Sequence, residues 1–77
     1  METLQEILNR INKSTKVEQK RAARASKVRD KMLLRGNIAV AEQQQKDLEE
    51  ATLSASRYQL LGDRLVLLGR EQGYKFE

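Results

Sequence analysis

Residues 32–37 read Met-Leu-Leu-Arg-Gly-Asn and stand near the midpoint of a 77-residue chain that contains no proline. Glycine and asparagine tolerate the positive φ that a chain often adopts just after a helix. Gly36-Asn37 is therefore the strongest turn signal in the sequence. We predict one helix before it, over about residues 2–35, and a second helix after it, over about residues 38–70.

The composition of the whole chain agrees with two long helices. Charged residues make up 34% of it, and alanine, leucine, glutamate, lysine, glutamine and arginine are abundant. This mixture is typical of long helices and coiled coils. We expect an all-α fold in which residues 1–77 form a single domain. It is an antiparallel two-helix hairpin of coiled-coil type, followed by a flexible tail over residues 71–77.

Heptad-like spacing defines a seam on the second helix. Its members are Ala41, Gln44, Leu48, Ala51, Ala55, Tyr58, Gly62, Leu65 and Gly69. Folding the chain at the turn brings Ile11 opposite Gly62 and Leu4 opposite Gly69. Large side chains then meet small ones, as close packing between helices requires.

A second apolar stripe on the same helix is not used by this seam. Leu53, Leu60, Leu67 and Tyr74 recur every seven residues, with Leu61 and Leu68 beside them. One partner helix cannot cover both stripes, and a domain this small rarely builds a sufficient core alone. We therefore expect a homo-oligomer or a complex with a larger helical protein. The alternative is that the first helix packs on Leu60, Leu61, Leu67 and Leu68 in another register.

Positive charge is concentrated in the first helix, although the chain as a whole carries a formal charge of +4. Helical spacing places seven cations in one stripe: Lys13, Lys16, Lys20, Arg24, Lys27, Lys31 and Arg35. Such a stripe is commonly a solvated surface or a contact for an acidic partner. The same helix also holds Arg29, which this register places near Gln44.

Nucleic-acid binding is the alternative function for this basic stripe. Residues 20–27 have the composition of an arginine-rich RNA-binding helix, and the row of cations could follow a phosphate backbone. No aromatic residue alternates with them to stack on bases. The alternative is thus a dimeric helical bundle that binds RNA or DNA, as small phage or plasmid regulators do. Binding to a membrane surface is disfavoured because this helix has no tryptophan or phenylalanine anchor.

Other classes of function are disfavoured by what the sequence lacks. There is no cysteine and no histidine. Asp47, Glu49 and Glu50 are spread around the helix, so we expect them to be solvated. We expect no enzyme activity, no metal and no cofactor. The aliphatic run Leu65–Leu68 is too short to cross a bilayer and the N-terminus has no signal-peptide pattern, which predicts a cytoplasmic protein without a membrane span.

Three local features suggest a family. They are the opening Leu4-Gln5-Glu6-Ile7-Leu8, the helix end Met32-Leu33-Leu34 leading into Arg35-Gly36, and a glutamine-rich second helix that leads to Tyr58. With these, residues 1–62 resemble the small co-chaperones of type III secretion needle subunits. The resemblance implies a cytoplasmic, non-enzymatic hairpin that binds a helical-repeat chaperone and helps to keep a needle subunit soluble. Leu4, Leu8 and Ile11 would then contact the larger chaperone.

Overall fold

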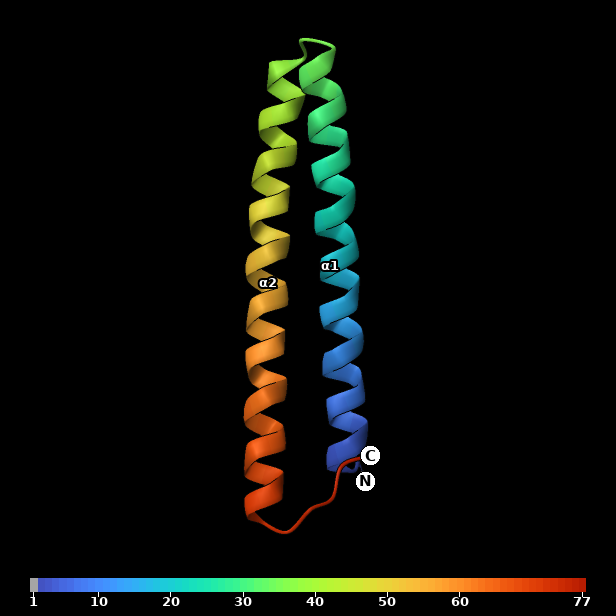
Figure 1. The fold of residues 1–77 in the computed structure, drawn as a ribbon, viewed down its shortest axis with the longest axis vertical. Helices are drawn as coiled ribbons and strands as arrows, with labels where there is room; N and C mark the ends of the chain where they lie inside the picture. The colour runs from blue at the N-terminus through green and yellow to red at the C-terminus, as the bar shows by residue number, and fades with distance from the viewer. Residues whose placement is uncertain (1) are drawn as a thin grey trace.

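The computed structural model describes residues 2–77 as two long helices, α1 (Leu4–Leu34) and α2 (Ile38–Glu71). They run antiparallel along one another and form a rod of 56 × 18 × 15 Å (Figure 1). The all-α hairpin predicted from the sequence is confirmed. The helix bounds differ from the predicted ones by no more than two residues.

The turn between the helices depends on Gly36, whose φ is +75°. Its N–H donates to the Leu33 carbonyl at 3.0 Å, and the Asn37 N–H donates to the Met32 carbonyl at 2.8 Å. This pair of bonds is the Schellman motif, which satisfies the last carbonyls of a helix. The Asn37 side chain then accepts the Val40 N–H at 3.3 Å and caps α2. Asn37 thus caps the end of α1 through its N–H and the start of α2 through its side chain.

The predicted seam is confirmed by what is buried between the helices, except at Tyr58, which is exposed. From α2 the buried residues are Ala41, Ala51, Ala55, Gly62 and Gly69, and from α1 they are Leu8 and Ala25. A Cβ placed on Gly62 would lie 3.4 Å from Ile11 Cγ2, and one on Gly69 would lie 3.5 Å from Leu4 Cδ1. The alternative register is wrong, because the four leucines that it would bury, Leu60, Leu61, Leu67 and Leu68, are all exposed.

Arg29 makes a different contact from the one expected. Its Nη1 donates to Oε1 of Gln45 at 2.6 Å, rather than meeting Gln44. Gln44 belongs to the seam, whereas Gln45 lies at the edge of it. The long arginine side chain therefore leaves the seam and places its guanidinium at the edge, where Asp30 also accepts from it at 2.9 Å.

The tail does not extend freely from α2 as the sequence led us to expect. Gly73 has a φ of +82°, and the Tyr74 N–H donates to the Gly69 carbonyl at 2.8 Å. This motif ends α2 as Gly36 ends α1, and the chain then crosses to the start of α1 (Figure 1). Tyr74 therefore lies outside α2 and does not continue the stripe of leucines.

Contacts with the first turn of α1 explain why the tail folds back. The first N–H groups of a helix have no partner within the helix. Thr3 Oγ1 accepts the Glu6 N–H, and the Tyr74 hydroxyl accepts the Gln5 N–H, both at 3.2 Å. The Phe76 ring packs edge-on against Tyr74, with ring centroids 4.9 Å apart. The tail thus helps to cap α1.

Candidate functional site

The two sides of the hairpin are different in character. Arg21 directly precedes Ala22, which faces α2, and Asp47 directly precedes Leu48 of the seam. The side chains of Arg21 and Asp47 form an ion pair across the seam. Residues that precede the seam in each helix therefore share one side, which we call the ion-pair side. The opposite side carries a shallow groove of mixed polar and apolar lining, to which Asn12, Gln59 and Val66 contribute.

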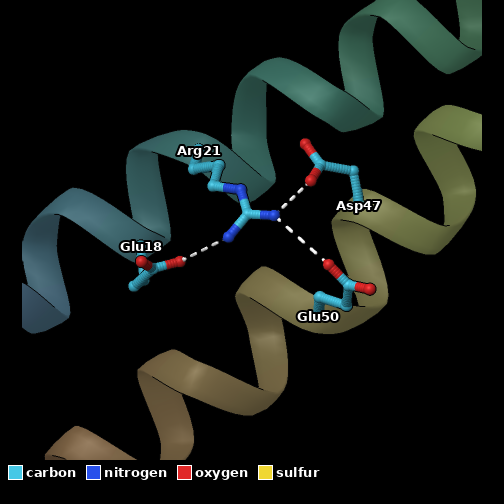
Figure 2. A network of polar contacts seen from close by, with 4 residues as sticks. All are labelled: Glu18, Arg21, Asp47 and Glu50. Atoms are coloured by element: carbon cyan, nitrogen blue, oxygen red, sulfur yellow. Dashed lines mark hydrogen bonds and ion pairs between the residues drawn. The ribbon is translucent and has the colours of Figure 1, made fainter.

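Arg21 is the centre of the polar network on the ion-pair side (Figure 2). Besides Asp47, its guanidinium contacts two further carboxylates. Glu50 of α2 is 3.5 Å away, and Glu18, on the same helix as Arg21, is 3.3 Å away. The hydrogen bond to Asp47 raises the pKa of Arg21 above its ordinary value. The expectation of a solvated carboxylate holds for Glu50, whose side chain is 74% exposed, but not for Asp47, whose carboxylate is paired with Arg21. Their partner is 26 or more residues away in sequence, and only the register of the hairpin brings it close.

Five leucines of α2 form an exposed cluster, which we call the leucine face, and helical spacing places the exposed Arg57 and Arg64 among them. The leucines are Leu53, Leu60, Leu61, Leu67 and Leu68, with exposed fractions between 52% and 61%. Leu61 and Leu68 directly precede Gly62 and Gly69 of the seam, so they lie on the ion-pair side. The other three lie further around α2, away from α1.

The remaining residues predicted as partner contacts are already engaged within the chain. Leu8 is buried, and Leu4 and Ile11 are half-buried against the two glycines of the seam. Tyr74 caps α1 through its hydroxyl. The expectation that these four residues form a free contact surface is therefore corrected. The surface left available is the leucine face.

Most of the basic stripe lies on the side of α1 that faces away from α2, and Lys16 borders the groove between the helices. All seven of its members are exposed: Lys13, Lys16, Lys20, Arg24, Lys27, Lys31 and Arg35. Within residues 2–77 none of them forms an ion pair. The pairs made by α1 cations use Arg10, Arg21 and Arg29 instead. The stripe is thus a row of uncompensated positive charge.

Comparisons with models of protein families, with curated proteins and with solved structures found no significant match. Neither helix of the hairpin, which together cover most of residues 2–77, is long and apolar enough to cross a membrane. The leucine face and the basic stripe are therefore the two candidate binding surfaces of this protein.

Proposed function

We propose that this chain is a non-enzymatic protein–protein interaction module and that the leucine face is its contact surface. One observation carries the proposal. Five leucines of α2 are more than half exposed although the opposite side of the same helix is already packed against α1. Exposed apolar surface of this kind on a small protein commonly marks a binding site.

The distribution of apolar groups supports this proposal energetically. The fully buried part of the seam consists of alanine, glycine and Leu8, and Leu4, Ile11, Leu48 and Leu65 are half-buried beside them. Fully burying a leucine contributes about 1.5–3 kcal/mol, so covering five half-exposed ones contributes about 4–8 kcal/mol as an upper range. A partner that covers this face therefore has a substantial apolar contribution available to it.

An adaptor or a chaperone-type subunit is the class of protein that this arrangement suits. A co-chaperone of type III secretion is one specific member of that class. That resemblance places the chaperone contact at Leu4, Leu8 and Ile11. Because these residues pack in the seam, we place the partner contact on the leucine face instead.

Photo-crosslinking in the native cells tests the proposal. A photo-reactive amino acid replaces Leu67, and in a control chain it replaces Leu34, which is 91% exposed but lies on α1 outside the leucine face. We expect a discrete protein adduct from position 67 and none from position 34. Mass spectrometry of the adduct distinguishes a second copy from another protein. Equal labelling at both positions, or no adduct at position 67, would refute the proposal.

A second candidate function is RNA or DNA binding by the basic stripe. The observation that favours it is the absence of ion pairs from all seven of these exposed cations within residues 2–77. Each phosphate contact releases a counterion, so binding would fall steeply between about 50 and 200 mM salt. Replacing Lys20 and Lys27 with glutamate should then abolish binding to generic RNA and duplex DNA. If the unchanged chain binds neither at low salt, this second function is excluded.

A further inference from the structure

We infer that the leucine face binds an amphipathic helix of another protein, and that this helix presents two acidic side chains seven residues apart, which pair with Arg57 and Arg64. The inference rests on the proposed function, because it takes the leucine face to be a protein-binding surface. It adds the chemistry of the partner. The position of the two arginines among the leucines carries it.

Both arginines lie inside the leucine face rather than at its edge. On a helix, the residues three and four positions away are the nearest neighbours of a side chain. All four of these positions around Arg64 hold leucines of the face, and three of the four around Arg57 do. The neighbours are Leu60, Leu61, Leu67 and Leu68 for Arg64, and Leu53, Leu60 and Leu61 for Arg57. A protein that covers the leucines must therefore cover the arginines as well.

Neither guanidinium has a carboxylate partner in the hairpin. Both side chains are exposed, and none of the ion pairs within residues 2–77 includes either of them. The fourth neighbouring position of Arg57 holds Ser54, so helical spacing offers no acidic residue to either arginine. Covering an unpaired charge with apolar groups is unfavourable, whereas an arginine can bind a carboxylate through two parallel hydrogen bonds. The leucine face is therefore complementary to an apolar surface that also carries negative charge.

The same charges argue against a second copy of this chain as the partner. If two leucine faces met with their leucines aligned, each guanidinium would be covered by a surface that offers leucines and further arginines. Like charges that meet in an interface oppose association. The occupant that fits is a different protein whose charges are opposite in sign.

The spacing of the arginines specifies a helical partner. Arg57 and Arg64 are seven residues apart on one side of α2, which separates their Cα atoms by about 10.5 Å along the helix axis. Two acidic residues seven positions apart on a partner helix have the same separation and also share one side. On an extended strand, residues that share a side are about 7 or about 13 Å apart, so a strand does not match. Apolar residues beside the acidic ones on the partner helix then pack on the leucines.

A variant of the full chain is the probe for this chemistry. Arg57→Glu combined with Arg64→Glu keeps the five leucines and supplies carboxylates at the required spacing; we call this variant the charge-reversed copy. With the leucine faces aligned antiparallel, each new carboxylate lies opposite an arginine of the unchanged chain. In sedimentation equilibrium, the mixture should associate at least about tenfold more tightly than the unchanged chain associates with itself. A mixture that associates no more tightly than the unchanged chain alone would overturn the inference.

Lys20→Glu combined with Lys27→Glu is the matched control. These lysines are also seven residues apart, and the change in net charge is the same, but they lie in the basic stripe of α1. This variant should not bind the unchanged chain as the charge-reversed copy does. Equal binding by both variants would show a general attraction between opposite charges and would contradict the assignment to the leucine face.

Photo-crosslinking at position 67 separates the inference from the proposed function. In the native cells, replacing Arg57 and Arg64 with glutamine should reduce the adduct at least about tenfold, and replacing both with lysine, which keeps the charge, should reduce it less. If the glutamine variant leaves the adduct unchanged, or if the adduct is a second copy, the acidic partner is excluded but the leucine face remains a protein-binding surface. If the unchanged chain yields no adduct, the inference and the proposed function both fail.

Discussion

Two glycine-to-alanine changes should alter stability in opposite directions, because the two glycines serve different purposes. Gly62 lies inside α2 and faces α1, whereas Gly36 is at the turn. Gly62→Ala should stabilise the hairpin, and Gly36→Ala should destabilise it. The chemical change is the same in both, so each variant is the control for the other.

The structure sets the size of each effect. Glycine inside a helix is about 1 kcal/mol less favourable than alanine. A methyl group on Gly62 would lie 3.4 Å from Ile11 Cγ2 and 3.6 Å from Leu8 Cδ1, so it fits at ordinary contact distance. We therefore expect a gain of about 1 kcal/mol, or a rise of about 4–8 °C in Tm. At Gly36 no atom lies within 4 Å of the new methyl. The Gly36→Ala variant is therefore destabilised only by the positive φ, which costs an alanine about 1–2 kcal/mol.

Urea unfolding followed by helical circular dichroism measures both changes. All chains must be compared at one protein concentration, because association stabilises the folded state by mass action. Gly62 lies outside the leucine face, so Gly62→Ala should also leave the sedimenting mass unchanged. If Gly62→Ala destabilises the protein by about 1 kcal/mol or more, the helices approach each other more closely than the packing at Ile11 allows. If Gly36→Ala is neutral, the turn does not need its positive φ.

Three further variants test the ends of the helices and the network between them. Asn37→Ala removes the acceptor for the Val40 N–H and should cost about 1 kcal/mol in urea unfolding; no loss would show that the cap is dispensable. Gly69→Ala would bring a Cβ within 2.6 Å of the Phe76 ring, so the tail should be displaced. The Glu77 N–H, which donates to Gln5 Oε1 at 2.8 Å, should then exchange faster; unchanged exchange would refute this packing. Arg21→Met should lower stability slightly at low salt and not at high salt, because exposed ion pairs are screened; a loss that persists at high salt would point to packing rather than charge.

Local chemistry allowed most of the fold to be predicted from the sequence. The dipeptide Gly36-Asn37 carries its own preference for positive φ and for capping, so the turn did not depend on distant residues. The seam followed from the spacing of small residues, because only these let two helices approach closely. Gly73 carried the same signal as Gly36, and Tyr74 was misplaced because its position was assigned by heptad spacing alone. The contact that holds Tyr74 joins residues 69 positions apart.

The candidate site was predictable where it depended on helical spacing and not where it depended on contacts between the helices. The leucines of α2 and the cations of α1 lie on the surfaces that their spacing indicated. The Arg21 network needed the register of the hairpin, since its partners are in the other helix. The contacts assigned to Leu4, Leu8 and Ile11 came from a family resemblance, and packing in the seam has taken up those side chains.

The composition of the seam explains why the leucine face exists at all. Alanine and glycine in the seam bring α1 and α2 close together, but they bury little apolar surface per residue. Leu4, Leu8 and Ile11 pack in this seam, whereas the five leucines of the leucine face lie at other helical positions of α2 and remain outside. A lone hairpin therefore exposes these leucines, and covering them couples its stability to association. In an equal mixture with the charge-reversed copy, the unfolding midpoint should consequently rise with protein concentration, and a concentration-independent midpoint would show that covering the leucines does not stabilise the fold.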